Sequence, residues 1–486
     1  MGDKREELLR PQLLIGRDWI SDASGGVMEH VNPATGQVQQ AIPVAGREEV
    51  NAAVAAASSA LPDWRSWTPD QRGAALRRIA DGLRSAAADL STVVTLENGT
   101  PVRATALTAA GSARHFDYYA GWTDKVTGSV YPVPTGFDYT IGEPYGVVAA
   151  LHAWNSSLQL IAMKLAPALA AGCTVVLKAP ELAPFSAVLF GQICLDAGLP
   201  PGVVNVISGG PATGDMLVRH PAIDKVSFTG GPEIARRIQA ACAESLTPVV
   251  FELGGKSANL IFEDADLDRA VEAAITGFTT LCGQACVAPT RLLVHKSIYS
   301  EVQDRIAAGT RAVTIGDPFD PKTTVGPLIS AKACERVLGA VQRATADGSG
   351  RLILGGQRLD GDLSAGYFVS PSVFADVHPG SDLSRNEIFG PVLSITPFGS
   401  EAEAVTLAND SPFGLAAYAH TRDLARAHRV AAQLDAGNVS VNGGIKTSQN
   451  SPVAPFGGFK DSGYGKEGGR EGLSEFQRIK NVNITF

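Results

Sequence analysis

The spacing of apolar residues changes along the first 143 residues of the chain. Residues 1–45 carry short apolar runs such as Leu13-Leu14-Ile15 between polar turns, which predicts small strands or hairpins. From Glu48 to about Ala120 the spacing becomes helical and alanine-rich, and residues 71–90 predict a single amphipathic helix. Residues 122–143 set their apolar positions among Gly, Pro and Thr, so we expect two extended strands outside the main sheet.

From Pro144 onward, short apolar runs alternate with helical segments. Strands are predicted at 147–151, 174–177, 203–207, 224–228 and from Val249, with helices at 158–171 and 185–197, from Gly214 and from Pro232. This alternation predicts a doubly wound parallel sheet, which binds ligands beyond the carboxyl ends of its strands.

The second half of the chain repeats the alternation of strand and helix. Strands are predicted at 292–294, 368–369, 373–374 and 438–442, and helices at 299–311, after 326–329 and at 401–408. Residues 455–463 alternate Phe with Gly and predict a glycine-rich loop. The fold class is therefore α/β.

Composition narrows the class of protein. A chain of 486 residues is long enough for roughly two to four domains. Its net charge of −8, with both signs interleaved, argues against a nucleic-acid partner. No apolar run approaches the ~20 residues that span a bilayer, and the charged N-terminus lacks the apolar region of a secretory signal. We therefore expect no membrane partner.

The six cysteines are scattered and do not form a disulfide framework. Cys282 and Cys286 are not a CxxC pair and no His stands at metal-ligand spacing, so no metal site is expected. These features predict a reduced enzyme of the cytoplasm.

Cys286 is the first candidate for chemistry. It lies between small residues after a Gly-Gln pair, which leaves room for a substrate carbonyl to reach the sulfur. A thiolate is a strong nucleophile near neutral pH when a helix N-terminus or a nearby base depresses its pKa. A lone cysteine is also often a small buried apolar residue, so the rest of the chain must decide.

Glu252 leaves the apolar run 249–251 and enters a glycine turn. A carboxyl group in apolar surroundings tends to have a raised pKa and can act as a general base. The alternative is a structural glutamate with satisfied hydrogen bonds.

Two segments of the first sheet point to a dinucleotide. The turn 228–231 has no Cβ at Gly230 and Gly231, so its backbone N–H groups and the following helix can face a pyrophosphate, although a tight turn alone explains it equally well. Lys178 and Glu181 follow a strand, and Glu181 can accept hydrogen bonds from ribose hydroxyls. Because a carboxylate repels a 2′-phosphate, the pair favours NAD; a surface ion pair is the alternative.

Taken together, these segments resemble the aldehyde dehydrogenase superfamily along nearly the whole chain. The motifs that carry the resemblance follow the family's order and approximate spacing: Trp154-Asn155, Lys178 with Glu181, Phe228-Thr229-Gly230, Glu252-Leu253-Gly254-Gly255-Lys256, Gly283-Gln284-Ala285-Cys286, Glu387-Ile388-Phe389-Gly390-Pro391 and Pro455-Phe456-Gly457-Gly458. Any one of them can arise by chance, whereas all of them together specify the fold and the nucleophile.

The resemblance implies an architecture and an activity. It implies a Rossmann-type NAD-binding domain (1–121 and 144–253), an α/β catalytic domain (254–469) and a small β oligomerisation arm (122–143 and 470–486). It implies a homodimer or homotetramer that uses NAD to oxidise a small aldehyde to the carboxylic acid, through a thiohemiacetal and a thioester on the cysteine.

The resemblance also implies roles for single residues. Cys286 is expected to be the nucleophile, Asn155 to hold the oxyanion with the Cys286 backbone N–H, and Glu252 to be the general base. Lys178 and Glu181 are expected to hold the adenosine ribose, and Glu387 the nicotinamide ribose with Phe389 beside the ring. Further cofactor contacts are expected at Leu151, Trp154, Gly214, Phe228, Thr229, Gly230, Gly231, Ile234 and Leu253.

Several positions depart from the family pattern. Gly231, followed by Pro232, replaces the usual Ser and removes a hydroxyl and a backbone N–H, which is expected to weaken the pyrophosphate site. Ser156-Ser157, Met163 and Leu281 leave fewer aromatic walls near the substrate, so we expect a different specificity. Substrate choice is expected to depend on the loops around Asn155, Met163, Leu281 and Asn450. Cys282 is expected to be a buried spectator, with a redox role as the alternative.

Two other functions fit the same fold. A CoA-acylating semialdehyde dehydrogenase needs no general base, and Glu252 argues against it. A non-catalytic member of the family would not need the set of Cys286, Glu252 and Asn155.

Overall fold

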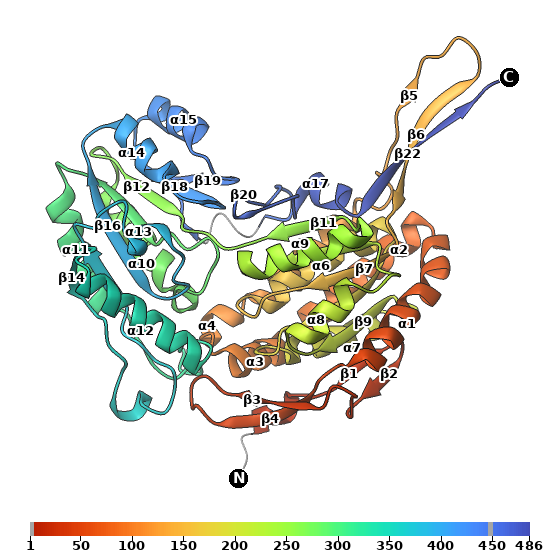
Figure 1. The fold of residues 1–486 in the computed structure, drawn as a ribbon, viewed down its shortest axis with the longest axis horizontal. Coiled ribbons are helices and arrows are strands. Elements are labelled where there is room, and N and C mark those ends of the chain that lie inside the picture. The colour runs from red at the N-terminus through yellow and green to blue at the C-terminus, as the bar shows by residue number, and fades with distance from the viewer. Residues whose placement is uncertain (1–3, 446–450) are drawn as a thin grey trace.

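The chain forms two α/β lobes and a projecting arm (Figure 1), in a computed structural model that describes residues 4–445 and 451–486. The arm stands away from the first lobe and carries the C-terminus. Asn450, expected to influence substrate choice, lies outside the described residues.

The first lobe is built on an eight-stranded sheet. Its order is β2-β1-β9-β8-β7-β10-β11-β21. The strands are β1 (Leu13–Ile15), β2 (Asp18–Ile20), β7 (Val147–Leu151), β8 (Thr174–Ala179), β9 (Val204–Ser208), β10 (Lys225–Thr229), β11 (Val249–Glu252) and β21 (Gly463–Tyr464). Strands β7 to β11 are parallel, and β1, β2 and β21 are antiparallel additions at the edges. Strands β8 and β9 lie on one side of β7, and β10 and β11 lie on its other side. The predicted doubly wound sheet is confirmed, and its switch point lies between β7 and β10.

Helices cover both faces of this sheet because its central strands are apolar on both sides. Val147 and Ala149 of β7 pack with α1, α8 and α9, whereas Val148 and Ala150 pack with α2, α5, α6 and α7. The helices are α1 (Arg47–Ser66), α2 (Pro69–Ser85), α3 (Ala87–Asn98), α4 (Val102–Thr105), α5 (Thr108–Ala120), α6 (Ser157–Ala171), α7 (Phe185–Asp196), α8 (Pro211–Val218) and α9 (Pro232–Ser245).

The prediction of one helix over residues 71–90 is wrong. Helix α2 ends at Ser85 and α3 begins at Ala87, with Ala86 between them at φ −88° and ψ 11°. The turn lets α2 pack on α5 while α3 packs on α7. Tertiary packing therefore divides a segment whose apolar spacing is continuous.

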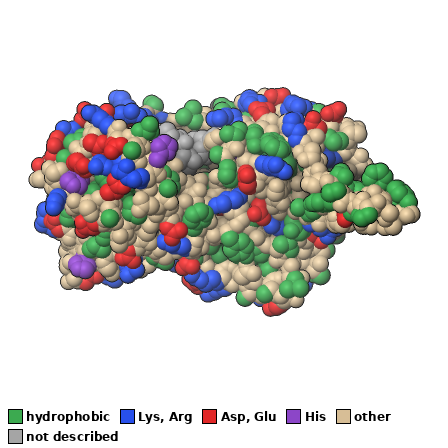
Figure 2. Space-filling view, turned by 90° about the horizontal axis from the view of Figure 1, so that it is seen from above, with side chains coloured by type: hydrophobic (Ala, Val, Ile, Leu, Met, Phe, Trp, Pro, Cys, Tyr) green, Lys and Arg blue, Asp and Glu red, His purple; other side chains and the backbone are tan. Residues whose placement is uncertain are grey.

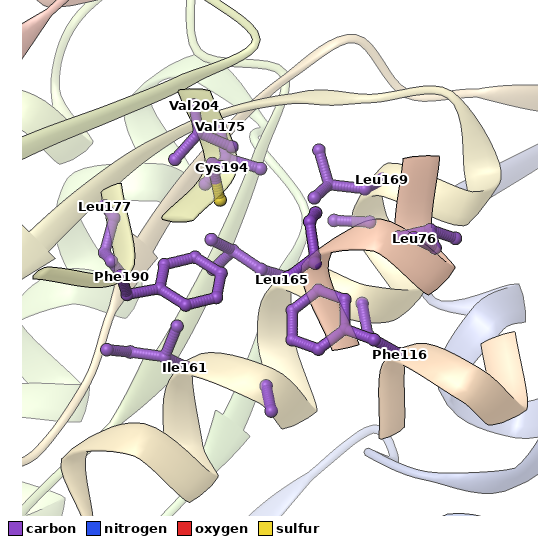
Figure 3. Close-up of a cluster of buried hydrophobic side chains, with 14 of the residues drawn as sticks. Leu76, Phe116, Ile161, Leu165, Leu169, Val175, Leu177, Phe190, Cys194 and Val204 are labelled. Atoms are coloured by element: carbon purple, nitrogen blue, oxygen red, sulfur yellow. The ribbon is translucent and has the colours of Figure 1, made fainter. Parts of the chain in front are cut away.

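Helix α6 lies at the centre of the first lobe. Figure 3 shows Ile161, Leu165 and Leu169 of α6 among Phe116 of α5, Phe190 of α7 and Leu177 of β8. The helix ends where Gly172 takes φ +96°, a conformation that favours glycine. Neither α6 nor any other helix within 4–445 and 451–486 is long and apolar enough to cross a membrane. The packing of α6 fixes the position of the segment that precedes it, residues 153–156.

The second lobe is built on a seven-stranded sheet of order β14-β15-β16-β13-β12-β18-β19, parallel except for β14. Its strands are β12 (Ala258–Ile261), β13 (Arg291–His295), β14 (Arg351–Leu354), β15 (Ser372–Ala375), β16 (Val392–Phe398), β18 (Ala416–His420) and β19 (Asn438–Val441). Its helices are α10 (Leu267–Thr279), η2 (Thr280–Gly283), α11 (Tyr299–Arg311), α12 (Ala331–Ala346), η3 (Gly361–Leu363), α13 (Asp382–Arg385), α14 (Glu401–Asn409) and α15 (Leu424–Gln433).

Two predictions for the second half need correction. Residues 368–369 are not a strand, because a single bridge between Arg358 and Val369 pairs this segment and no ladder forms. The predicted loop 455–463 contains β20 (Phe459–Lys460), which pairs with β17 (Phe413–Gly414), and it leads into β21. Because β21 pairs with β11 of the first sheet, this segment joins the two lobes beside Glu252.

The arm consists of β5 (Val130–Tyr131), β6 (Phe137–Pro144) and β22 (Gln477–Ile484). The expectation of two strands outside the main sheet is confirmed, and the C-terminal strand β22 pairs along the whole of β6. Val130 and Ile479 are 76% and 79% exposed, and Figure 2 shows hydrophobic side chains covering the arm. The remaining N-terminal elements are η1 (Lys4–Leu8) and the hairpin of β3 (Val27–Val31) and β4 (Val38–Pro43).

We expect Leu165→Ala to lower the free energy of unfolding by about 2–5 kcal/mol, since it leaves a cavity in the cluster that holds α6. Denaturant titration measures this loss. Leu424→Ala removes the same side chain from a position that is 72% exposed and is expected to cost less than about 0.5 kcal/mol. Equal losses in the two variants would contradict this account of the core.

Candidate active site

A cavity of about 290 Å³ lies where the carboxyl ends of β7 and β10 face the second lobe. The first lobe contributes residues 153–156, one face of α6 and the turn 229–231, and the second lobe contributes Ala285, Cys286, Arg336 and Phe456. The cavity brings together these predicted site residues: Trp154, Asn155, Thr229, Gly230, Gly231, Leu253, Cys286, Glu387 and Phe389. Residues from distant parts of the sequence therefore converge at the switch point of the first sheet.

The other predicted residues do not line this cavity: Leu151, Lys178, Glu181, Gly214, Phe228, Ile234 and Glu252. Lys178 is buried at the end of β8 and its Nζ lies 3.3 Å from Oε2 of Glu181, whose side chain is 41% exposed. Burial lowers the pKa of Lys178 and the Glu181 carboxylate opposes that shift. Ile234, in the first turn of α9, is 40% exposed.

The turn before Cys286 is strained. Leu281, Cys282 and Gly283 have φ of +52°, +55° and +68°, and each non-glycine residue in this region costs about 1–3 kcal/mol. A Cβ on Gly283 would lie 2.3 Å from the Gly390 carbonyl, so glycine is required there. The close approach fixes the Cys286 segment against the turn that carries Phe389. Cys282 is buried, as expected.

Asn155 lies immediately before α6 and is buried against the Cys286 segment. Its Nδ2 donates to the Gln284 carbonyl at 2.9 Å, which leaves the second amide hydrogen for a ligand. The backbone carbonyl of Trp154 accepts a hydrogen bond from Nδ2 of Asn98, at the end of α3. The Asn155 amide is therefore fixed next to the thiol.

Glu252 ends β11 and is buried outside the cavity lining. Neither of its carboxyl oxygens has a hydrogen-bond partner among the described residues. Burial raises the pKa of Glu252 well above its usual value, and the nearby Glu467 raises it further, against the opposing effect of Lys164. Lys164 and Glu467 form a buried ion pair at 2.7 Å. Burial and the Glu467 carboxylate therefore both disfavour the ionised form of Glu252.

Glu387 enters the cavity from the second lobe. Its Oε1 accepts a hydrogen bond from the Gly255 N–H at 3.1 Å, and burial raises its pKa to about 7. Arg336 holds the following turn by donating to the Ile388 carbonyl at 3.1 Å and the Phe389 carbonyl at 3.3 Å. The rings of Phe389 and Trp154 meet edge to face with centroids 5.5 Å apart. These contacts close one end of the cavity.

Cys286 is only partly exposed, and its surroundings do not depress the pKa of its thiol. Burial, followed by the Glu387 and Glu252 carboxyl groups, raises that pKa to about 12, while the backbone N–H groups of Val287 and Cys286 lower it. The depressed thiol pKa that favours a strong nucleophile is therefore not seen for Cys286 in this structure. Moving the Glu387 carboxylate away from the sulfur would relieve one of the opposing charges.

The model of the aldehyde dehydrogenase family matches residues 19–482 of the chain. The chain belongs to the aldehyde dehydrogenase family. A (Z)-2-((N-methylformamido)methylene)-5-hydroxybutyrolactone dehydrogenase of Acinetobacter baylyi is 42% identical over 461 residues, which cover 93% of each protein. A betaine aldehyde dehydrogenase of Cereibacter sphaeroides is 40% identical over 467 residues, which cover 96% of this chain and 95% of that one.

Solved structures agree with this assignment. A betaine aldehyde dehydrogenase from Staphylococcus aureus in complex with NAD+ superposes with a TM-score of 0.96 at 32% identity, covering 99% of this chain and 97% of its own. PnpE in complex with nicotinamide adenine dinucleotide, whose source is Pseudomonas sp. WBC-3, gives a TM-score of 0.95 at 36% identity, covering 98% of each chain. The predictions of the family, of the α/β fold and of NAD-dependent oxidation of an aldehyde are confirmed.

Two residues of this aldehyde dehydrogenase site were missed by the sequence analysis. Arg336 comes from α12, which no motif of the chain marks. Gln159 lies four residues after Asn155 and four before Met163, and this helical spacing places it on the cavity face of α6. The sequence signal that could have identified Gln159 is an uncharged polar side chain four residues before Met163 in a mostly apolar helix.

We expect the rate of Cys286 alkylation by iodoacetamide to rise with pH through at least pH 10 in the free enzyme. The raised pKa keeps the thiolate fraction small near neutral pH, and that fraction grows as the pH approaches the pKa. Cys286→Ala supplies the background, because the other five cysteines are buried. A rate that reaches its plateau below pH 8 would contradict the raised pKa.

We expect Gly231→Ser to lower the Kd for NAD by about 2- to 10-fold, the value of one hydrogen bond. Gly231 precedes α9 without a side-chain cap, and a Cβ there meets nothing within 4 Å, so a serine hydroxyl fits. Titration of NAD by calorimetry measures the change. Gly231→Ala adds the Cβ without the hydroxyl, and the same affinity in both variants would show that the missing hydroxyl does not weaken the site.

Proposed function

We propose that Cys286 is the nucleophile, that Asn155 holds the oxyanion and that Glu252 is the general base of a hydrolytic, NAD-dependent aldehyde dehydrogenase. The observation that carries the proposal is one cavity that holds the thiol, the spare hydrogen of the Asn155 amide and the carboxyl ends of β7 and β10. Glu252 lies beside this cavity with two carboxyl oxygens that lack partners among the described residues, so it has capacity to hold a water.

The chain's residues fit an NAD molecule along the carboxyl edge of the first sheet. Gly230 and Gly231 present backbone at the start of α9, and the Thr229 hydroxyl, buried in the cavity lining, has no partner among the described residues. Lys178 and Glu181 stand at the end of β8 for the adenosine ribose, and Glu387 for the nicotinamide ribose beside Phe389. Leu151, Trp154, Gly214, Phe228, Ile234 and Leu253 complete the proposed binding surface.

In the proposed reaction the Cys286 thiol gives its proton to water, and the thiolate attacks the aldehyde carbon, which opens the C=O double bond and forms the oxyanion of a thiohemiacetal. The Asn155 amide and the Cys286 backbone N–H donate to its oxygen, and removing one such donor typically costs about 100- to 1,000-fold in rate. NAD, when bound, accepts the hydride that leaves this carbon, and a thioester remains on Cys286. Glu252, once deprotonated, takes a proton from water; the hydroxide attacks the thioester, the C–S bond breaks, and the carboxylic acid departs.

The side chains of the cavity wall bear on the choice of substrate. Quaternary ammonium groups are recognised by cages of aromatic rings. The described lining residues include three aromatic rings, and two of them, Trp154 and Phe389, contact each other edge to face, which leaves Phe456 as the third. Ser156, Gln159, Leu160 and Met163 add non-aromatic side chains to the same lining. We therefore propose an uncharged aldehyde rather than betaine aldehyde as substrate.

The domain assignment follows the sheets except at β21, which lies within the catalytic range but pairs with the first sheet. We assign residues 1–121 and 144–253 to the NAD-binding domain, 254–469 to the catalytic domain, and 122–143 with 470–486 to the oligomerisation arm. The exposed apolar side chains of β5, β6 and β22 support assembly of a homodimer or homotetramer. The six free cysteines support a reducing compartment, and we propose the cytoplasm.

Glu252→Gln tests the assignment of the base. We expect the variant to keep a burst of about one NADH per active site but to lose steady-state turnover by about 100- to 10,000-fold, since only hydrolysis of the thioester needs the base. Stopped-flow absorbance measures both phases. Glu48→Gln, on the exposed first turn of α1, is the control and is expected to keep both rates.

Two outcomes would overturn the proposed function. Loss of the burst in Glu252→Gln, with NAD binding intact, would remove Glu252 from the role of base. A requirement for CoA in wild-type turnover would instead favour the acylating reaction.

A further inference from the structure

Every residue of α6 except Gln159 is buried, because the sheet and α5 pack around the helix. Gln159 is partly exposed, and the space it faces is the cavity that it lines with Leu160 and Met163. Gln159 is the only polar residue of α6 among the described residues that line the cavity, so it gives this face of the helix a hydrogen-bonding group inside the site.

A second polar side chain holds Gln159 in place. Its Nε2 lies 2.7 Å from Nε2 of His115 on α5, and His115 is only 2% exposed. Burial lowers the pKa of His115 to about 4, so its ring is neutral at the pH of an ordinary assay and accepts the amide hydrogen. The Gln159 amide keeps one N–H and its carbonyl oxygen for another partner.

This pair is costly as packing alone. The His115 Nδ1 is buried and has no hydrogen-bond partner among the described residues, and a buried group without a partner destabilises the fold. The amide packs closely on α5, since a Cβ added at Gly111 would lie 3.4 Å from Gln159 Oε1, in van der Waals contact. Apolar side chains at 115 and 159 would fill the same space without that cost, so the pair is better explained by a ligand that uses the amide.

We propose that Gln159, positioned by His115, selects aldehydes that carry an uncharged hydrogen-bonding group, such as an amide or a hydroxyl, several bonds from the aldehyde carbon. Gln159 lies in the first turn of α6, and Asn155, the proposed oxyanion donor, lies in the turn that precedes the helix; both line the same cavity. The charged side chains among the described lining residues are Arg336 and Glu387. Glu387 accepts from the Gly255 N–H, and Arg336 donates to the carbonyls of the Phe389 turn. This inference rests on the proposed function, since it requires an aldehyde attached to Cys286 in the cavity.

The test compares 3-acetamidopropanal with its alkyl isostere, 5-methylhexanal. The measured quantity is the ratio of kcat/KM for the two aldehydes, because intrinsic reactivity cancels when the ratio is compared between variants. We expect Gln159→Leu to lower the ratio of amide to alkyl substrate by about 5- to 100-fold. The value for the alkyl aldehyde is expected to rise, because the wall becomes more apolar.

His115 is tested as a positioning residue. We expect His115→Phe to lower the same ratio in the wild-type background. In the Gln159→Leu background we expect His115→Phe to leave the ratio unchanged. His115→Gln keeps a hydrogen-bond acceptor and is expected to retain part of the preference for the amide substrate. A purely structural role would change the melting temperature but not the ratio. Leu160→Met is the matched control on the same wall and is expected to preserve the ratio, whatever its effect on each rate.

The outcomes separate this inference from the proposed function. A ratio that stays within about 2-fold in Gln159→Leu, with both aldehydes oxidised, overturns the inference alone. Oxidation of other aldehydes but not of 3-acetamidopropanal also overturns it alone. Absence of NADH formation with every aldehyde tested overturns the proposed function and the inference with it. If the ratio falls as expected, and His115→Phe does not change it further in the Gln159→Leu background, the result supports the inference and the proposed function.

Discussion

The site depends on the close approach of glycine backbone to two buried carboxyl groups. A Cβ on Gly457 would lie 2.7 Å from Oε1 of Glu252, and one on Gly254 would lie 2.2 Å from Oε2 of Glu387. These glycines let a strand of one lobe and a turn of the other bring both acids to the thiol. The segment 455–464 reinforces the arrangement, because β21 joins the first sheet next to Glu252.

Crowding these groups together changes their proton affinities in the same direction. The carboxyl groups of Glu252 and Glu387 and the thiol of Cys286 lose contact with water, and the two carboxyl groups disfavour a negative charge on the sulfur. Burial therefore raises the pKa of all three groups. The buried pair of Lys164 and Glu467 adds a fixed cation and anion behind Glu252, and the anion has the larger effect on its pKa.

The same cavity shows how specificity is built on a common scaffold. Backbone and buried residues position the sheet and the proposed nucleophile and oxyanion donor, Cys286 and Asn155, whereas the proposed substrate wall is one face of α6. A change of side chain there alters the wall without moving the scaffold, because the opposite face of α6 is held by Phe116, Phe190 and Leu177. The pair of Gln159 and His115 uses that freedom.

The sequence by itself determined the doubly wound sheet, the second α/β lobe, the extended arm and the family, because apolar periodicity and motif order are local properties. It also named most of the residues that meet in the cavity, since each motif follows a strand and parallel strands end at one edge. Only the tertiary structure decided where the helix over 71–90 divides, that 368–369 forms no ladder and that β21 closes the first sheet. It also decided the raised pKa of Cys286 and the contact between Gln159 and His115. These features depend on burial and on neighbours 44 to more than 200 residues away in the chain, which no local pattern encodes.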